Sequence, residues 1–334
     1  MRRTRESYPT DLSDAEWEYL EGHLPTPERD GRPRVHSLRE ILDAVFYVLR
    51  SGCAWRLLPH DFPPWKTVYH YFRQFRLDGT WERLHSALRQ RVRVRLQRDP
   101  QPSAAIVDSQ SVKTTGVGGE QRGYDGAKKI KGRKRHLLVD THGLVLEVRV
   151  HSAEIQDREG IKVLLDPSSP DRLPRLSHVW LDAGYTGQDK GAGWVESVLG
   201  WSTEIVRHPP KAAPQEVMMR WAREWAKEGV AVDPKTLLPE EGPRPFLPIR
   251  WIVERTFSWL CQNRRMSKDY ERLPESSEAF IYVAMSRLMA RYASCQVCKS
   301  PMQLLCSPLL SSRPVAAVLP SAPPFDLSSP TTQR

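Results

Sequence analysis

The sequence has few cysteines and no long apolar run. Five cysteines occur in 334 residues, and an odd, sparse set argues against a disulfide framework. Cys295 and Cys298 have the spacing of half a zinc site, but no second pair accompanies them. No stretch approaches the ~18 apolar residues of a membrane span, and the first residues lack the apolar core of a signal peptide. We therefore expect a cytoplasmic protein that does not enter a membrane.

Nucleotide-binding fingerprints and internal repeats are also missing. The glycine-rich stretch 116–126 has the spacing of neither the P-loop nor the dinucleotide-binding motif. We expect a flexible loop there, and no nucleotide cofactor.

The composition is that of a globular protein with an excess of positive charge. Hydrophobic residues make up 40% and charged residues 27% of the chain, and the length suggests two domains. The net charge of +10 fits a polyanionic partner such as nucleic acid. A merely basic surface is the alternative, and net charge alone does not decide between them.

Residues 1–98 are predicted to form an all-helical domain. Ser13 and Glu16 form a capping box for the first helix, and apolar residues recur at helical spacing from Leu38 to Leu49. A third helix begins after Pro63-Pro64 and has a basic face that carries Lys66, His70 and Arg73. A helix-turn-helix DNA-binding domain and a plain four-helix bundle fit this pattern equally well.

From Ser103 the pattern changes to that of an α/β domain, which we place at 101–297. Strands are predicted at 104–113, 137–140, 144–150, 176–181 and 203–207, with helices at 157–165 and 188–199. The first, fourth and fifth strands are joined by crossovers and should be parallel, with the hairpin antiparallel beside them. A proline-bracketed insert at 209–247 with a helix at 215–229 precedes two more helices, at 250–265 and 276–294. The last 37 residues, 298–334, hold seven Pro and seven Ser and are predicted to be disordered.

A strongly basic run lies before the predicted hairpin. It holds six Lys or Arg and no acidic residue in nine positions: Lys128, Lys129, Lys131, Arg133, Lys134 and Arg135. Most basic runs of this kind face solvent and bind nothing specific. Because this one leads into a strand beside a buried carboxylate, we expect it to contact phosphate groups.

Three carboxylates stand in unusual places. Asp108 lies inside a buried strand, Asp182 comes directly after another, and Glu254 lies in an apolar helix. A cationic side chain is the ordinary partner for each, for example Arg250 for Glu254. Clustered carboxylates, however, repel one another unless cations join them, and their hard oxygens suit Mg²⁺ or Mn²⁺. Two such ions can assist displacement at a phosphodiester.

Several motifs together resemble those of the DDE transposases of bacterial insertion sequences. They are Ile106-Val-Asp-Ser-Gln-Ser-Val-Lys113, Lys131-Gly-Arg-Lys-Arg-His-Leu-Leu-Val-Asp140, Trp180-Leu-Asp-Ala-Gly-Tyr185 and Arg250-Trp-Ile-Val-Glu-Arg-Thr-Phe257. The nearest likeness is to insertion sequence family five, within the larger family-four group. It covers about residues 7–293, because Leu12-Ser-Asp-Ala-Glu-Trp17 and Ser51-Gly-Cys-Ala-Trp-Arg-Leu-Leu-Pro59 also match the family's leading domain.

The resemblance implies an RNase H-like catalytic fold and two-metal DNA cleavage and strand transfer. Asp108, Asp182 and Glu254 match the family's catalytic and metal-binding triad. The partners implied are the terminal inverted repeats of the element and the target DNA, bound by a homodimer at the bacterial nucleoid. No covalent protein–DNA link is expected, so Ser and Tyr residues near the site should serve only to position it.

The larger group also has a Tyr, Arg, Glu, Lys signature around the glutamate. Arg250 and Glu254 match it, but Leu247 stands in place of Tyr and Cys261 in place of Lys. Helical spacing suggests that Arg264 or Arg265 supplies the missing cation, which would contact DNA together with Arg250.

Two other functions compete with transposition. A DNA-binding regulator derived from such a fold would have lost the chemistry, which the presence of all three carboxylates argues against. A metal-dependent nuclease without strand transfer has the same sequence features.

Overall fold

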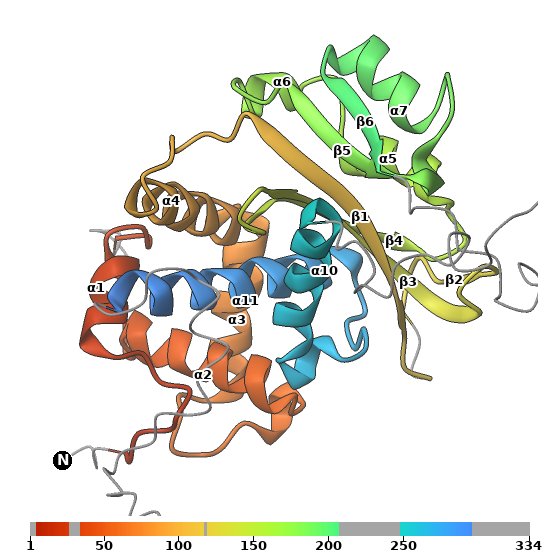
Figure 1. Ribbon diagram of the computed structural model, residues 1–334. Helices are drawn as coiled ribbons and strands as arrows, with labels where there is room; N and C mark the ends of the chain where they lie inside the picture. The colour runs from red at the N-terminus through yellow and green to blue at the C-terminus, as the bar shows by residue number, and fades with distance from the viewer. Residues whose placement is uncertain (1–4, 27–33, 117–118, 207–247, 296–334) are drawn as a thin grey trace, which may run out of the picture.

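Six strands of the chain form one mixed sheet with helices on both faces (Figure 1). The structure is a computed structural model that describes residues 5–26, 34–116, 119–206 and 248–295. The strands are β1 (Ala104–Lys113), β2 (Gly123–Asp125), β3 (Ile130–Asp140), β4 (Val145–Ser152), β5 (His178–Asp182) and β6 (Ser202–Val206). Their order is β2-β3-β1-β5-β6, and β4 pairs with β3.

The predicted strand directions are confirmed. β1, β5 and β6 are parallel, whereas β3 is antiparallel to both β1 and β4. β1 has the predicted bounds, because its apolar start and flanking prolines are strong local signals. β3 is longer than predicted: it begins at Ile130, so most of the basic run lies inside the sheet.

The first four helices form a layer on one side of the sheet. They are α1 (Asp14–Glu21), α2 (Leu38–Ser51), α3 (Trp65–Leu77) and α4 (Thr80–Arg95), with the short η1 (Trp55–Leu57) before α3. The capping box of Ser13 and Glu16 is present, as is one of Ser37 and Glu40. α2 ends at Gly52, whose φ of 74° is a left-handed conformation that favours glycine.

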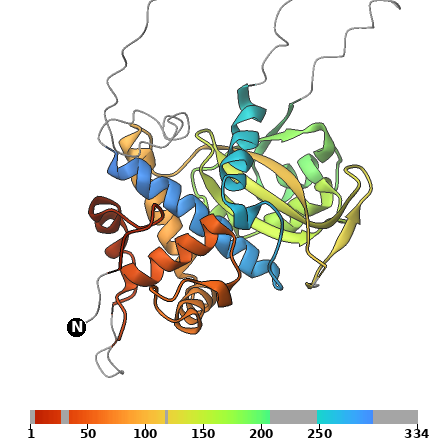
Figure 2. The same cartoon turned by 90° about the horizontal axis from the view of Figure 1, so that it is seen from below.

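A helix from the far end of the chain completes this layer. α11 (Pro274–Ser294) runs through it in Figures 1 and 2, and its Phe280 ring lies 4.5 Å from that of Phe72 on α3. One hydrophobic core joins α1–α4, α10, α11 and one face of the sheet. The two predicted domains therefore share a core across the boundary expected near residue 98.

α10 (Pro248–Cys261) lies between the helical layer and β1 (Figures 1 and 2). The turn η4 (Arg264–Met266) follows it and packs near the end of α2. α10 is thus shorter than the helix predicted to continue to residue 265.

The opposite face of the sheet has a second core. It is covered by α5 (Asp157–Leu164), α6 (Ser169–Arg172), α7 (Gly191–Trp194) and the π-helical turn η3 (Val195–Leu199). The short turn η2 (Ala183–Tyr185) follows β5 directly. The single helix predicted at 188–199 is therefore α7 continued by η3.

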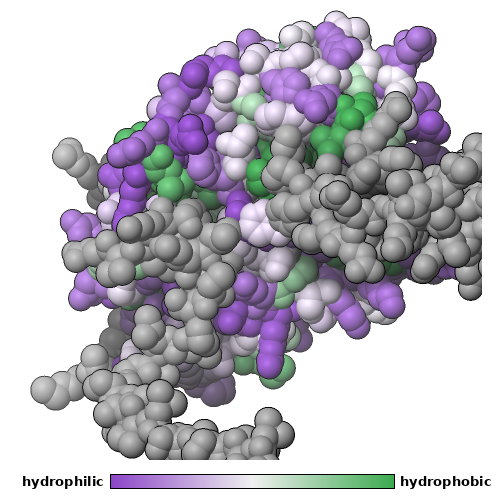
Figure 3. Space-filling view, in the orientation of Figure 1, coloured by the Kyte–Doolittle hydropathy of each residue, from purple (hydrophilic) through white to green (hydrophobic). Residues whose placement is uncertain are grey.

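The described part of the face in Figure 3 is mainly hydrophilic, with small separate apolar areas. No helix among the described residues has the length and apolar character needed to cross a membrane. The predicted insert at 209–247, the tail at 298–334 and Cys298 lie outside the described residues.

Candidate active site

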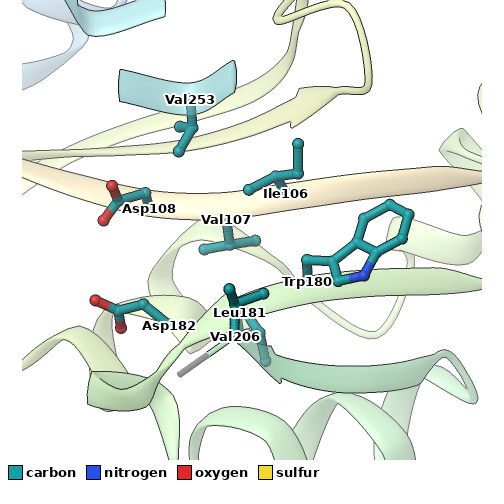
Figure 4. A pocket seen from close by; sticks show the side chains of 8 residues that line it. All are labelled: Ile106, Val107, Asp108, Trp180, Leu181, Asp182, Val206 and Val253. Carbon is teal, nitrogen blue, oxygen red and sulfur yellow. The ribbon is translucent and has the colours of Figure 1, made fainter. Parts of the chain in front are cut away.

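Asp108 and Asp182 lie side by side because β1 and β5 are adjacent parallel strands in matched register. Ala104 pairs with His178 and Ile106 with Trp180, and two residues further along each strand come Asp108 and Asp182. Neighbouring strands are ~4.8 Å apart, and alternate residues share a face. Both carboxylates therefore stand on the same face, and both line one pocket with Val253 above them (Figure 4).

Backbone groups orient both carboxylates. The Ser109 N–H donates to Asp108 Oδ1 at 2.7 Å, and the Gly184 N–H donates to Asp182 Oδ1 at 2.8 Å. Both side chains are partly exposed, so solvent reaches oxygens that the chain holds in place. Such a pair is suited to hold a divalent cation, since carboxylate oxygens are its preferred ligands.

Glu254 lies on the side of α10 that adjoins the Asp108 face of β1, as a contact further along the helix indicates. Cys261, two helical turns later, faces the same way, and its Sγ lies 3.8 Å from Nε2 of Gln110. Gln110 shares a face of β1 with Asp108, so the side of α10 that carries Glu254 adjoins the Asp108 face. Among the described residues, however, no three His, Cys, Asp or Glu side chains are grouped closely enough to hold a metal. The structure thus brings two of the predicted ligands together and places the third nearby.

Half of the basic run is buried, which corrects its predicted role. Lys128, Lys129 and Lys131 are exposed, and Lys128 Nζ donates to the carbonyl of Ser109 at 3.1 Å, next to the site. Arg133, Lys134 and Arg135 are at most 3% exposed. Solvent does not reach them, so the expected phosphate contacts do not apply to these three residues.

The buried cations bind other parts of the chain, on alternate faces of β3. Arg133 pairs with Asp269 at 3.3 Å and donates to three backbone carbonyls, whereas Arg135 Nη1 donates to the Met266 carbonyl at 2.8 Å. On the other face, Lys134 Nζ lies 2.7 Å from Asp157 Oδ1. Burial raises the pKa of Asp157, but hydrogen bonds from Lys134 and Ser109 outweigh it and hold that pKa below its usual value. Strand alternation explains why Lys134 points away from Arg133 and Arg135, but no local pattern in the sequence indicates that all three are buried.

The expected cation after Glu254 is also revised. α10 ends at Cys261, so helical spacing does not extend to residues 264 and 265. Arg265 is buried, pairs with Glu271 at 2.6 Å and donates to the Cys53 carbonyl at 2.9 Å. Arg264 is exposed and remains a candidate. Leu247 and the side chain of Arg250 lie outside the described residues.

The basic face of α3 is exposed as expected. Lys66, His70 and Arg73 are exposed, while Val68 and Phe72 pack into the core. Residues 52–64, which include η1, connect α2 to α3. A helix-turn-helix has a turn of three or four residues. The helix-turn-helix is therefore not confirmed.

Comparisons with known proteins agree with this arrangement. Residues 99–289 match the family described as "Transposase DDE domain", and residues 12–85 match that described as "Putative transposase of IS4/5 family". The chain belongs to the DDE transposases of the IS4/5 group. A relative, the insertion element IS402 uncharacterized 16.2 kDa protein of Burkholderia cepacia, is 33% identical over 114 residues. That match covers 32% of this chain and 76% of the relative, and no solved structure gives a significant match.

Membership of this family carries several consequences for the transposase. A DDE domain implies an RNase H-like fold, with which the mixed sheet and its helices agree. It also implies an enzyme that acts on DNA in transposition and generally uses divalent metal ions.

Proposed function

We propose that this transposase binds the terminal inverted repeats of its insertion sequence and catalyses metal-dependent strand cleavage and strand transfer. The observation that carries the proposal is the pairing of Asp108 and Asp182 at one level of two parallel strands, in a chain that matches the DDE domain. The position of α10 beside β1 supports the assignment of Glu254 as the third acidic residue.

We expect two Mg²⁺ ions, replaceable by Mn²⁺, at these carboxylates. Two carboxylates on one face, each partly exposed and oriented by a backbone N–H, fit a hard divalent cation. When bound, such ions lower the pKa of a water and stabilise negative charge on a leaving oxygen. Asp108, Asp182 and Glu254 are the residues that would hold these ions.

In the proposed reaction, a water oxygen bonds to phosphorus as the bond from phosphorus to the 3′ oxygen breaks. The 3′ oxygen takes up a proton and leaves as a hydroxyl. That hydroxyl then attacks a phosphorus of target DNA, forming one phosphodiester bond as another breaks. The chain contributes orientation through Asp108, Asp182 and Glu254, and no side chain forms a bond to DNA.

DNA would lie on the exposed cations. We assign sequence-dependent contacts with the element's ends to Lys66, His70 and Arg73 on α3. Lys128, Lys129 and Lys131 would contact phosphates, because Lys128 lies next to the site. Arg264 and Arg250 are further candidates. A homodimer would bind the two inverted ends together.

Charge removal at two of the acidic residues tests the proposal. Asp182→Asn and Glu254→Gln keep side-chain shape and should each lower the cleavage rate of end DNA in Mg²⁺ by ~10³-fold or more, roughly 4 kcal/mol of barrier. End binding, measured by gel shift with the whole protein, should change less than about twofold. Asp171→Asn and Glu18→Gln remove the same charges at exposed positions away from the site and should leave cleavage unchanged.

Four results would contradict the proposal. The first is a Glu254→Gln protein that still cuts in Mg²⁺, and the second is a protein–DNA adduct that survives denaturation. The third would reduce the function to that of a nuclease: cleavage by the wild type, but no joining of a pre-cut 3′-hydroxyl end to target DNA. A wild type that binds ends and never cuts would indicate a regulator.

A further inference from the structure

Three buried rings form a hydrogen-bonded chain beneath the acidic pair. The Tyr185 hydroxyl lies 2.5 Å from His136 Nε2, and His136 Nδ1 lies 3.3 Å from His151 Nε2. His151 Nδ1 lies 2.9 Å from the carbonyl oxygen of Ser152. All three side chains are at most 2% exposed. No role assigned so far uses them.

The direction of each of these three hydrogen bonds follows from the partner of His151, the last ring of the series. A carbonyl oxygen only accepts, so His151 Nδ1 carries the proton and, in a neutral ring, its Nε2 accepts. His136 Nδ1 must then donate to His151, which leaves His136 Nε2 to accept from the Tyr185 hydroxyl. Burial lowers the pKa of both histidines, that of His136 to about 3, so both rings are neutral at pH 7. Only this arrangement allows all three hydrogen bonds to form.

Packing holds the rings in this arrangement. α5 passes directly over them at Gly160, where a Cβ would come within 2.6 Å of His136 Nδ1 and 3.1 Å of His151 Nε2. A larger residue would displace the rings, so the contact requires glycine. The hydrogen-bonded chain is therefore fixed from one side by α5 and from the other by the sheet.

The three hydrogen-bonded rings connect the elements that carry the acidic pair. Tyr185 ends η2, the turn whose N-terminal cap is Asp182. His136 on β3 pairs with Ser109, the residue after Asp108 on β1. The hydrogen bond from Tyr185 to His136 thus ties the turn after β5 to the strand on the far side of β1. A shift of η2 would move the Gly184 N–H that orients Asp182 Oδ1, and would thereby turn the carboxylate away from Asp108.

We propose that Tyr185, His136 and His151 are positioning residues that hold the Asp182 carboxylate beside that of Asp108. This inference rests on the proposed metal-dependent function. Removal of the tyrosine hydroxyl frees η2 without altering any carboxylate. The variant should therefore need more Mg²⁺ for cleavage, whereas its binding of DNA ends, assigned to α3, should not change.

The test measures the Mg²⁺ concentration that gives half-maximal cleavage of end DNA. Tyr185→Phe should raise it about tenfold, the scale on which groups that support metal ligands act. Excess Mg²⁺ should restore much of the rate, and metal-free end binding should stay within about twofold. Tyr282→Phe is the matched control: a buried tyrosine on α11 whose ring lies 5.1 Å from that of His85. It should leave the Mg²⁺ requirement unchanged.

A second measurement serves if Tyr185→Phe does not fold. Long-range ¹⁵N–¹H spectra of the wild type at pH 7 should find His136 and His151 both neutral and protonated at Nδ1. Protonation of His136 at Nε2 would overturn the proposal, as would a folded Tyr185→Phe protein with the Mg²⁺ requirement of the wild type. Failure of the wild type to cleave at all would instead refute the proposed function.

Discussion

Asp108 and Ser109 are neighbours on β1, yet their side chains point to opposite faces of the sheet and meet different surroundings. Asp108 faces α10 and lines a pocket together with Asp182. Ser109 faces α5 and donates to Asp157 Oδ1 at 2.7 Å, which also accepts from Lys134. Two adjacent polar residues thus belong to different parts of the molecule.

The difference teaches how this sheet can hold many polar residues. On the α10 face, carboxylates remain partly exposed, which suits groups that must exchange ligands. On the α5 face, Lys134, His136 and Tyr185 are buried. Lys134 is hydrogen-bonded to Asp157 and Tyr185 to His136, which suits groups that must not move. Loss of a polar group should therefore act directly on the chemistry on the first face, and on stability and the placement of Asp182 on the second. Three predictions bear on this comparison.

The largest effect is expected where a buried cation is removed from the α5 face. Lys134→Met deletes the ion pair with Asp157 and leaves that carboxylate without its cation. We expect the free energy of unfolding to fall by about 3 kcal/mol, as when one partner of a buried pair is removed. Urea titration of the whole protein measures it. Lys131→Met, an exposed position in the same run, should change it by less than about 0.5 kcal/mol. Equal decreases for the two variants would break the comparison.

A smaller effect is expected from pH. The folded pKa of His136 is about 3, below the 6.5 of the exposed ring, so below pH 6.5 the unfolded state binds a proton that the folded state excludes. Its contribution to stability is complete above pH 6.5 and declines as pH falls toward 3, by about 2 kcal/mol between pH 6.5 and 5. The groups that face it are His151, Asp157, Lys134, Lys128 and Tyr185.

The measurement is the free energy of unfolding of wild type and His136→Gln at several pH values. Asp43 and Glu278, whose pKa values burial raises to about 6 and about 7, act in the opposite direction but are common to both proteins. The difference between the two curves should therefore shrink as pH falls from 6.5. Parallel curves would refute a neutral, buried His136.

The smallest effect on stability is expected at the exposed lysines. Lys129→Ala with Lys131→Ala should leave unfolding unchanged and weaken binding to every DNA sequence alike. The slope of log affinity against log salt should become shallower by about 0.9 for each phosphate that a lysine no longer neutralises. Lys162→Ala on α5, exposed on the other side of the sheet, is the control and should leave the slope unchanged. A weakening confined to the terminal repeats would instead make these lysines sequence readers.

The sequence alone determined the parts of this transposase that depend on near neighbours. The capping box of Ser13 and Glu16, the helix end at Gly52 and the bounds of β1 arise within one turn or one strand, so spacing and residue type suffice. The parallel arrangement of β1, β5 and β6 follows from the crossovers between them. Even the neighbourhood of Asp108 and Asp182 was predictable, since each lies at the same edge of parallel strands.

Only the tertiary structure decided which charges face solvent. Arg133 is buried because Asp269, Glu271 and Arg272, more than 130 residues away, fold back to accept its hydrogen bonds. Arg265 is buried because it donates to the Cys53 carbonyl and pairs with Glu271. The helical layer shares a core with the sheet because α11 packs into that layer. A charged side chain has the same local pattern whether it is solvated or paired. Its burial depends on the free energy of contacts with distant partners, which only the folded chain brings together.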